Sequence, residues 1–330
     1  MFLASRDAVP EGLRHGVVAI GNFDGVHRGH QAVLKAAIER ARIVGGPVAA
    51  LTFEPHPRQF FRPDVPLFRL TPDHVKAELF AALGLSGAVT LTFDADIAAL
   101  SAEAFVKRWI ADGFAADQVI VGYDFHFGKG REGSPVKLSA LGLTHGFQVT
   151  IVGAQSGEGD TPYSSTAVRE ALADGRLEEA RGQLGYRWFF ESEVVHGEKR
   201  GRDLGYPTAN MALDPAVTLR HGVYAVRARD VRSGGPILFG VASFGRRPQF
   251  DNGAPLFETH FFDFADDLYG RPLEIELIAF LRPEARFDSV ETLIEQMDRD
   301  SVAARHAIAD VALDPFGPEA LTSAREQPAP

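Results

Sequence analysis

Two histidines three residues apart carry the first chemical signal in this sequence. His27 and His30 follow the apolar run Val17–Gly21 and a turn that contains Gly25, and they begin a stretch with helical periodicity. A strand, a glycine-containing turn and a helix start form an anion site, because backbone N–H groups and the helix dipole face the turn. Both imidazoles can then donate to a bound triphosphate. Spacing alone also permits two metal ligands or two solvent-facing side chains.

A second group suited to phosphate lies later in the chain. The segment Tyr163–Leu172 contains the hydroxyl residues Ser164, Ser165 and Thr166 before a helical stretch, with Arg169 about one turn further on. Thr166 and Arg169 share one face of such a helix, and hydroxyls with a guanidinium at a helix N-terminus suit phosphate oxygens. A helix cap followed by a surface arginine is an equally consistent interpretation of this segment alone.

A loop between these two segments combines glycines, cations and aromatic rings. It follows the apolar run Gln118–Tyr123 and begins with Asp124, Phe125 and, two residues later, Phe127. In open parallel sheets, ligands bind at the carboxyl ends of strands, so the two rings are placed to border a flat ligand. The alternative is that these aromatic residues cover the local core.

The densest polar segment of the second half runs from His196 to Asn210. It contains three glycines and three cations, and those expected to bind a nucleotide are Gly197, Lys199, Gly201 and Arg202. Backbone N–H groups of such a loop can surround phosphates, whereas an ordinary solvated hairpin loop would have a similar composition.

The end of this segment has a sharper pattern. Pro207 stiffens an extended stretch in which Thr208 and Asn210, at alternate positions, point to the same side. Their neutral oxygens could hold hydrated Mg2+ together with ATP phosphates. A strand face on which the two residues cap a turn is the simpler alternative.

Glu258 is a carboxylate inside an otherwise apolar strand-like run. It shares a face with Leu256, His260 and Phe262. A carboxylate among such neighbours is expected to be functional or paired. If it faces the mouth of a barrel, it can accept the proton of a primary alcohol that attacks the γ-phosphate of ATP.

The first half of the chain, which must position the candidate phosphate ligands, alternates between short apolar runs and amphipathic stretches. This rhythm predicts a parallel sheet with helical connections. The predicted strands are Val17–Gly21, Pro47–Phe53, Ala88–Phe93, Gln118–Tyr123 and Gln148–Gly153. One helix is predicted to begin after Thr71 and Pro72 and to end at Gly84. Another is predicted to begin after Ser101 and to end at Gly113.

After Tyr186 the pattern changes to strand-like runs with few helical stretches, which predicts an antiparallel barrel. The runs are Trp188–Gly197, Gly222–Val231, Ile237–Gly245, Leu256–Phe264 and Leu273–Leu281. An amphipathic helix from about Ser289 to Ala309 should pack on this barrel. The tail after Asp314 is rich in Pro, Gly, Ser and Glu, and is expected to be flexible.

Composition limits the function classes. The 330 residues have 34 Lys and Arg against 44 Asp and Glu, a net charge of -10 that disfavours sequence-independent nucleic-acid binding. The chain has no cysteine, which excludes disulfides and thiolate chemistry and is compatible with a reducing cytoplasm. It contains no run of about 20 apolar residues, so we expect a cytoplasmic protein without a membrane partner. A transient homo-oligomer stays open, because composition does not determine assembly.

The first half resembles a known enzyme module. The stretches GNFDGVHRGH (21–30), TFEPHP (52–57), VGYDFHFGKGREG (121–133) and YSSTAVREAL (163–172) are similar, in this order, to the adenylyltransferase module of bacterial bifunctional riboflavin kinase/FAD synthetases. The resemblance implies a Rossmann-like nucleotidyltransferase fold of the His-x-Gly-His superfamily. It also implies that the ATP phosphates are surrounded by Gly21, Asn22, Asp24, His27 and His30, and on the other side by Ser164, Ser165, Thr166 and Arg169. Phe23 and Gly29 lie within the same motif. Ala167 departs from the family pattern, which commonly has a further basic residue there.

The second half is similar to the riboflavin kinase module of the same family. The similar stretches include VVHGEKRGRDLGYPTANM (194–211), GVYAV (222–226), FETHFFDF (257–264) and DLYG (267–270). The resemblance implies a six-stranded barrel in which Thr208 and Asn210 bind Mg-nucleotide and Glu258 is the general base. It also implies that the segment around Arg282 borders the flavin. Ser243 and Gln249 depart from the usual Asn-Ile-Gly-x-Arg-Pro-Thr pattern.

Together these features predict an α/β protein with three parts: an FMN adenylyltransferase domain (1–184), a riboflavin kinase domain (185–312) and a flexible tail (313–330). The expected substrates and products are ATP, riboflavin, FMN and FAD, with Mg2+ and direct in-line transfer without a covalent enzyme intermediate. The alternatives are a cytidylyltransferase or pantetheine-phosphate adenylyltransferase, which would need no kinase barrel, and a flavin-binding regulator with a decayed site, for which a base beside a metal pair would have no use.

Overall fold

The computed structural model describes residues 2–157, 161–197, 205–232, 235–246, 255–309 and 311. Their contacts divide the chain into two compact units. Of the described residues, the first comprises those up to Leu67 together with Thr71–Ser165, and the second comprises Phe68–Leu70 and those from Thr166 to Val311. The short segment Phe68–Leu70 therefore leaves the first unit and returns to it within three residues.

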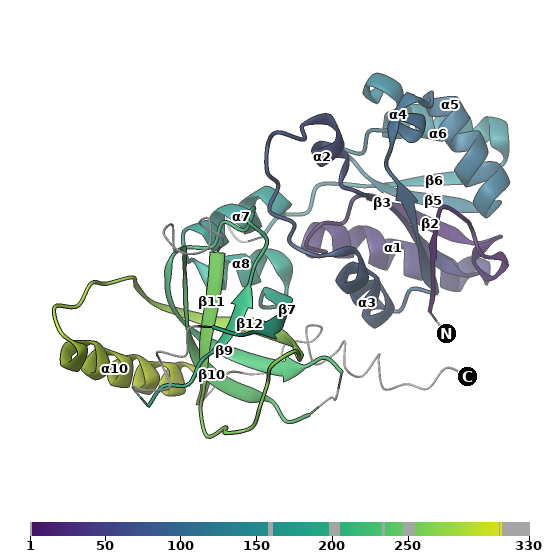
Figure 1. Cartoon of the computed structure of the whole chain (residues 1–330). Coiled ribbons are helices and arrows are strands. Elements are labelled where there is room, and N and C mark those ends of the chain that lie inside the picture. Colours follow the sequence, from purple (N-terminus) through teal and green to yellow (C-terminus); the bar gives the residue numbers. More distant parts are fainter. Residues whose placement is uncertain are drawn as a thin grey trace. The chain divides into compact units, whose positions relative to one another are not determined.

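A six-stranded parallel sheet forms the centre of the first unit (Figure 1). Its order is β1-β4-β3-β2-β5-β6. The strands are β1 (Leu3–Arg6), β2 (Val17–Ile20), β3 (Val48–Glu54), β4 (Gly87–Thr92), β5 (Gln118–Gly122) and β6 (Gln148–Val152). The predicted parallel sheet is thus confirmed, and the N-terminal edge strand β1, which the apolar rhythm did not reveal, adds to it through parallel pairing with β4.

The connections between these strands are mostly helical. They are η1 (Glu11–Leu13), α1 (Arg28–Val44), α2 (Pro57–Phe61), α3 (Asp73–Leu83), α4 (Ala95–Ala99), α5 (Ala102–Phe105), the π-helix η2 (Val106–Phe114), η3 (Lys129–Arg131) and α6 (Pro135–His145). The predicted bounds of α3 are confirmed, because Pro72 precedes it and Gly84 caps it with a φ of 97°.

The predicted end of the next helix at Gly113 is wrong. Ser101 does cap α5, since its hydroxyl accepts the backbone N–H of Ala104 at 3.1 Å. The chain then widens into the π-helix η2, which passes through Gly113 and ends at Ala115 with a φ of 45°. The backbone N–H of Ala116 closes this end by donating to the carbonyl of Ile110 at 3.1 Å. An Ala therefore occupies the left-handed position that usually favours glycine.

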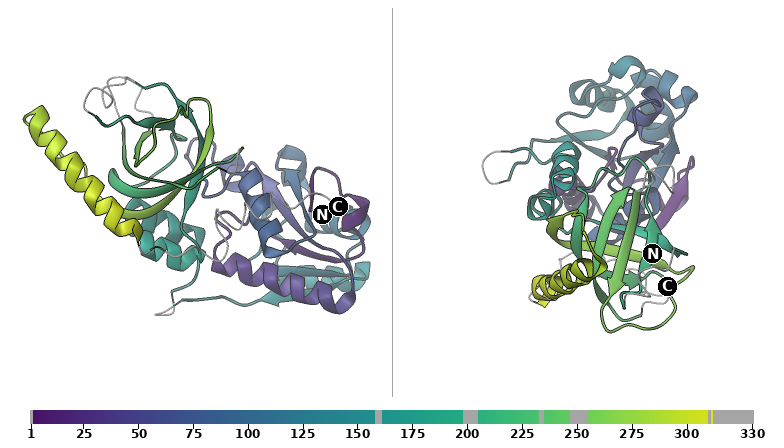
Figure 2. Two further views of the ribbon diagram at one scale, coloured as in Figure 1. Left: turned by 90° about the horizontal axis from the view of Figure 1, so that it is seen from below. Right: turned by 60° about the vertical axis from the view of Figure 1, so that its left-hand side comes forward.

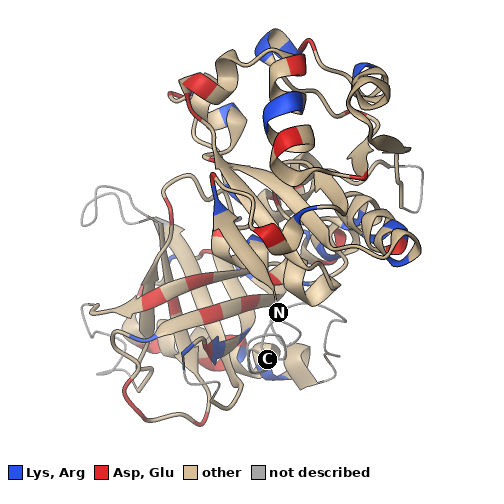
Figure 3. Cartoon of the chain, turned by 90° about the vertical axis from the view of Figure 1, so that its right-hand side faces the viewer, with Lys and Arg blue, Asp and Glu red and all other residues tan. Residues whose placement is uncertain are grey.

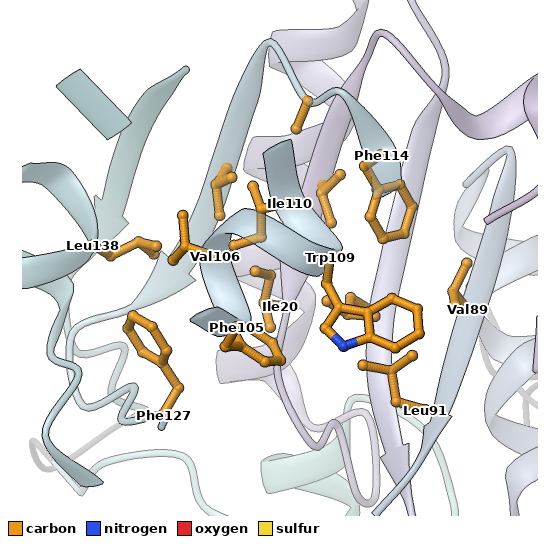
Figure 4. Packing of buried hydrophobic residues seen from close by; sticks show 14 of the residues in the cluster. Ile20, Val89, Leu91, Phe105, Val106, Trp109, Ile110, Phe114, Phe127 and Leu138 are labelled. Atoms are coloured by element: carbon orange, nitrogen blue, oxygen red, sulfur yellow. The ribbon is translucent and has the colours of Figure 1, made fainter. Parts of the chain in front are cut away.

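Alternate residues of the strands pack against helices on one face of the sheet. The side chains of α5, η2 and α6 point toward this face (Figure 4), and the cluster includes Ile20, Val89, Leu91, Phe105, Trp109, Ile110, Phe114 and Leu138. Nearly continuous apolar strands are expected when a parallel sheet is covered on both sides, and β2 is buried at all four positions.

The strand order changes direction at the centre of this sheet. From β2 the chain proceeds outward through β3 and β4, and then crosses back to place β5 on the other side of β2. At such a switch point the loops that leave neighbouring strands diverge, which opens a binding crevice at the carboxyl edge. The loops after β2 and β5 are the two that contain Gly21–His30 and Asp124–Phe127.

A closed barrel forms most of the second unit, as predicted. The helices α7 (Ser165–Ala173) and α8 (Leu177–Leu184) precede it. Its strands are β7 (Phe189–Val195), β8 (Ala209–Ala212), β9 (Gly222–Asp230), β10 (Leu238–Arg246), β11 (Pro255–Phe261) and β12 (Pro272–Pro283), in the closed order β10-β11-β8-β7-β12-β9. All pairings are antiparallel.

The helix α10 (Val290–Ala309) lies along the outside of this barrel (Figure 2). Its fully buried Ala304 packs with Val223, Val241 and Ile278 of β9, β10 and β12. The guanidinium of Arg282 on β12 also binds Asp300 of the helix, with Nε to Oδ1 at 2.8 Å and Nη2 to Oδ2 at 2.6 Å. The predicted helix and its docking on the barrel are confirmed.

Charged residues of both signs occur on the helices and strands of the described chain. In the view of Figure 3, Lys and Arg occur together with Asp and Glu on the helices.

Among the described residues, no helix is both long and apolar enough to cross a membrane.

Candidate active sites

The turn between β2 and α1 is held by side chains that bind its backbone. The carboxylate of Asp24 accepts the backbone N–H of Thr71 at 3.1 Å, and the Thr71 hydroxyl accepts the backbone N–H of Gly25 at 2.9 Å. The Ser165 hydroxyl donates to the Asp24 carbonyl at 2.8 Å. Asp24 is 1% exposed. Among the predicted phosphate-site residues, Asp24 and Ser165 are thus brought together, and both fix the shape of the turn.

The backbone of this turn is strained. Gly25 has a φ of 82°, and the non-glycine residues Phe23 and Val26 have φ values of 51° and 38°. Such conformations cost about 1–3 kcal/mol each and persist where the surroundings impose them. The Phe23 ring is buried edge-on against His30 and Phe80, at centroid distances of 5.4 and 5.5 Å. Phe23 therefore offers a ligand its backbone rather than its ring.

His27 and His30 stack on each other at the start of α1. Their ring centroids are 3.6 Å apart and the planes differ by 24°. His27 is the N-cap residue, and its Nδ1 accepts the backbone N–H of His30 at 3.4 Å. Because Nδ1 is the acceptor, the proton of neutral His27 lies on Nε2, which makes Nε2 a hydrogen-bond donor. The stacking and the N-cap hydrogen bond therefore fix the two imidazole rings of the predicted pair relative to each other.

Burial lowers the pKa of His30 well below its ordinary value of 6.5. The neighbouring His27, Lys76 and His56 lower it further, because a second positive charge is unfavourable beside them. The Nδ1 atom of His30 is shielded from solvent and has no hydrogen-bond partner in the protein. His30 is therefore neutral at pH 7, and one polar atom of its ring has no partner among the described residues of the protein.

Gly29 makes room for the histidine pair. A Cβ atom at this position would lie 3.1 Å from ring atoms of His27 and 3.5 Å from the Cβ of Tyr163. The first distance is tighter than ordinary van der Waals contact, so a side chain here would displace the His27 ring.

The helix α7 presents the remaining predicted phosphate ligands. Ser165 is its first residue and Thr166 is exposed beside it, while Ser164 directly precedes the helix. The Nε of Arg169 donates to the carbonyl of Phe68 at 2.6 Å. Arg169 thereby fastens the segment Phe68–Leu70 within the second unit.

The loop after β5 contributes one aromatic ring to the local core and leaves the other only partly buried. The rings of Phe125 and Phe127 stack at 5.4 Å with an interplanar angle of 14°. Phe127 is buried in the core of the first unit, whereas Phe125 is only partly buried against it. Asp124 is exposed, and its carbonyl binds the Nδ1 of His126 at 2.8 Å. Phe125 and Asp124 are the accessible members of this predicted set.

A row of polar residues crosses three strands of the barrel. Asn210 on β8 lies directly opposite Glu258 on β11, and Glu258 lies directly opposite Ser243 on β10. Side chains at directly opposed positions point to the same face, with Cβ atoms about 4.5–5.5 Å apart. On β11, Phe257 and Thr259 are fully buried, whereas Leu256, Glu258 and His260 are partly exposed. Glu258 therefore faces away from the buried interior of the barrel, on the side predicted from its neighbours.

The loop before β8 places its backbone against this row. A Cβ atom at Gly197 would collide with the Asn210 side-chain amide, so only glycine fits there. The Nδ2 of Asn210 donates to the carbonyl of Thr208 at 3.4 Å, which leaves the amide oxygen of Asn210 as an acceptor. The Nδ1–H of His260 donates to the carbonyl of Pro207 at 3.0 Å. Of the nucleotide-binding residues predicted in this loop, Lys199, Gly201 and Arg202 lie outside the described residues, as does Gln249.

The helix α10 contacts the segment that precedes β8. The Tyr206 hydroxyl donates to Asp298 of α10, and the Tyr206 ring lies 4.9 Å from that of His260. Arg282 donates to Asp300 and, through Nη1, to the carbonyl of Pro283 at 2.9 Å. The predicted flavin-side residue Arg282 thus also anchors the helix.

Sequence reasoning did not identify Thr71 and Lys76 as members of the first site. Thr71 was interpreted only as the start of α3, although its hydroxyl and backbone N–H both bind the Asp24 turn. Lys76 was not singled out, and its Nζ lies 3.5 Å from the Asn22 carbonyl. The one available signal was the spacing Thr71-x4-Lys76, which places Thr71 just before α3 and Lys76 on its first turn.

Comparison with known proteins shows that both halves of the chain match one family of enzymes. A family model described as FAD synthetase matches residues 9–167, and a second described as riboflavin kinase matches residues 184–308. The bifunctional riboflavin kinase/FMN adenylyltransferase of Escherichia coli K12 is 40% identical over 289 residues, covering 88% of this chain and 91% of that protein. The chain belongs to this family. It is a riboflavin kinase and an FMN adenylyltransferase, with the adenylyltransferase in the first half and the kinase in the second.

Other relatives agree with this assignment. The protein of the same name from Listeria monocytogenes is 39% identical over 294 residues, covering 88% of this chain and 91% of that protein. A Streptococcus pneumoniae crystal structure, named as a macrolide-efflux protein, has a TM-score of 0.81 and 29% identity, covering 93% of this chain and 97% of that one. The fold of that solved structure is therefore similar to this one over most of the chain.

Proposed function

We propose that both reactions are direct in-line transfers at two separate sites, without a covalent enzyme intermediate. The adenylyl site is the Gly21–His30 turn, and the kinase site is the face of the barrel that carries Asn210 and Glu258. The observation that carries the proposal is the opposition of Asn210 and Glu258, because it sets a neutral oxygen ligand beside a carboxylate base. We place the boundaries at residues 1–184 and 185–312, with 313–330 as a tail.

In the adenylyl site, the FMN phosphate attacks the α-phosphorus of ATP. This phosphate is already anionic, so the chain supplies position and charge rather than a nucleophile. The Nε2–H of His27 and the ring of neutral His30 donate to oxygens that gain charge in the transition state. Arg169 stabilises the pyrophosphate leaving group, and the backbone N–H groups of the turn hold the phosphates.

In the kinase site, the terminal hydroxyl of riboflavin attacks the γ-phosphorus of ATP. The carboxylate of Glu258 accepts the hydroxyl proton as the new O–P bond forms. Its position on the partly exposed face of β11 leaves it accessible to a substrate, and His260 on the same face holds the Pro207–Asn210 segment in place through the Pro207 carbonyl.

The residues present fit a magnesium ion that is shared with a nucleotide. Among the described residues, no group of three His, Asp or Glu side chains is arranged to hold a metal alone. The oxygens of Thr208 and Asn210 are neutral, and Mg2+ prefers one or two protein ligands together with phosphates and water. When bound, the ion would neutralise charge on the transferring phosphate. Gly197 supports this assignment, because its missing side chain lets the loop backbone approach Asn210.

The remaining contacts follow from these placements. For the adenylyl site we propose nucleotide or flavin contacts from Gly21, Asn22, Phe23, Asp24, Gly29, Asp124, Phe125, Phe127, Ser164, Ser165 and Thr166. For the kinase site we propose contacts from Gly197, Lys199, Gly201, Arg202, Pro207, Thr208, Asn210 and Arg282. A cytoplasmic location and a transient homo-oligomer stay predictions, which cell fractionation and light scattering test.

The stereochemistry at phosphorus tests in-line transfer. ATP with an isotopically chiral γ-phosphate should give FMN with inverted configuration, because a single in-line displacement inverts the phosphorus centre. ATP with a chiral α-phosphorus should likewise give inverted FAD. Retention in either product would require two displacements through a covalent enzyme intermediate and would refute the proposal for that half.

A further inference from the structure

A buried lysine lies directly beneath the turn that we assign to the ATP phosphates. Lys76 is in the first turns of α3, and its side chain is 1% exposed. Burying an ammonium group costs several kcal/mol unless partners replace the lost water. A buried ammonium group therefore needs polar partners, and those partners indicate what it can hold in place.

The hydrogen-bond partners of Lys76 include the backbone of the Gly21–His30 turn. Its Nζ donates to the Thr52 hydroxyl on β3 at 3.2 Å and lies 3.5 Å from the carbonyl oxygen of Asn22. The Thr52 hydroxyl in turn donates to the same Asn22 carbonyl at 3.2 Å. One carbonyl of the phosphate turn is thus the shared acceptor of a buried cation and a buried hydroxyl.

Holding the Asn22 carbonyl also sets the direction of the Phe23 N–H, which belongs to the same peptide group. A carbonyl and the N–H that follows it point in opposite directions across a planar peptide. A carbonyl directed down toward Lys76 therefore turns the Phe23 N–H away from the core, which is the orientation that an anion site requires. The strained φ of 51° at Phe23 is consistent with a backbone held by its surroundings.

The charge of Lys76 also acts on the histidines. It is one of the groups that lower the pKa of His30, together with burial, His27 and His56. The carboxylates of Asp73 and Glu54 lie 3.8 and 3.9 Å from Nζ and form ion pairs with the ammonium. The ammonium group therefore contacts two acidic residues as well as the backbone of the turn.

We propose that Lys76 is a positioning residue for adenylyl transfer, which acts by holding the Asn22 carbonyl so that the turn presents its N–H groups to the ATP phosphates. The proposal rests on the assignment of the triphosphate to the Gly21–His30 turn. It extends that assignment to a residue that touches neither substrate.

The test uses the full chain with Lys76→Met, which keeps the length of the side chain and removes its charge. Adenylylation of supplied FMN should fall on the order of 100-fold in kcat, as expected for misplaced reacting groups, with a smaller change in the KM for FMN. Kinase activity in the same protein should change by less than about twofold, because the kinase site lies in the other unit. The exposed Lys35 of α1 provides the matched control, Lys35→Met, which should leave both activities unchanged.

Two further variants make the outcome decisive. Thr52→Val removes the hydroxyl that shares the Asn22 carbonyl and should lower adenylylation kcat without removing the charge, and Lys76→Arg should recover part of the activity lost in Lys76→Met. Equal loss of both activities, or loss of adenylylation only in step with a lower Tm, would show a purely structural lysine. His30→Ala separates the two hypotheses: if it impairs adenylylation while Lys76→Met does not, the positioning role fails alone, and if His30→Ala is fully active, the phosphate-site assignment fails first.

Discussion

Asn210 on β8 and Glu258 on β11 are directly opposed across one antiparallel pair, although 48 positions separate them in the chain. The ladder gives them a common face, on which Ser243 of β10 is the next residue. The backbone ladder thus sets an amide side chain and a carboxylate side by side. This arrangement leads to a first prediction about the base.

Glu258→Gln should abolish riboflavin phosphorylation and preserve FMN adenylylation. The amide keeps the size of the side chain but does not accept the proton of the attacking hydroxyl, and removal of a general base costs roughly 100- to 10,000-fold. Separate assays with riboflavin and with FMN measure the two steps. Glu193→Gln, an exposed residue of β7, serves as the matched control. Loss of both steps in folded Glu258→Gln would contradict two independent sites.

His30→Ala should have the reverse effect. The variant removes a donor to the transition state at the other site, which is worth roughly 100- to 1,000-fold in kcat. Kinase activity, followed as ADP formed from riboflavin and ATP, should stay within about twofold of the parent. Retained FAD synthesis from FMN would show that the stacked histidines have no catalytic role.

Gly197→Ala should impair kinase activity even though the substitution adds only one methyl group. The added methyl group would collide with the Asn210 amide. A displaced Asn210 amide should lower kcat/KM for MgATP by up to about 100-fold, as expected when a group at the site is misplaced by about 1 Å. A matched change, Gly182→Ala, adds a methyl group where the surroundings are open and should be tolerated. Equal behaviour of the two variants would contradict the close approach at Asn210.

The stability of the chain should fall below about pH 6.5 in part because of His30. Its pKa is lower in the folded protein than its ordinary value of 6.5, so the unfolded chain binds the proton more readily. This contribution is fully present above pH 6.5 and is lost as the pH falls toward the folded pKa, with a slope of at most about 1.4 kcal/mol per pH unit. Calorimetry should therefore show a smaller drop in Tm between about pH 7.5 and 5.5 for His30→Gln than for the parent. An unchanged drop would mean that His30 is readily protonated.

Asp300→Asn should loosen α10 from the barrel. The variant weakens the bidentate pair with Arg282, of which Asp300 is 8% and Arg282 23% exposed at the side chain. Breaking a buried pair costs about 3–5 kcal/mol, and the partial exposure of Arg282 places this one at or below the lower figure. Asp263→Asn, which affects the exposed pair with Arg305, is the control and should change stability little. Limited proteolysis within 290–309 should accelerate only in the first variant.

The order of elements could be predicted from the sequence because it depends on local periodicity. The apolar runs predicted five of the six strands of the sheet, and the change of pattern after Tyr186 predicted the barrel. The edge strand β1 was missed because it has four residues of alternating exposure, which is too short a pattern to stand out. The helix end at Gly113 was wrong because a π-helix changes the number of residues per turn, which no glycine signals.

The sequence by itself determined the two enzyme modules of the chain and the candidate residues for the chemistry of each half. His27 and His30, the Thr208 and Asn210 pair, and Glu258 could be selected because rare combinations of residue type and short spacing carry that information. Tertiary structure alone decided what surrounds them. The opposition of Asn210 and Glu258 depends on strand register, and the approach of Lys76 and Thr71 to the Asn22–Gly25 turn depends on where α3 packs. Both are contacts between residues distant in sequence, which are fixed by the packing of the whole unit rather than by any local pattern.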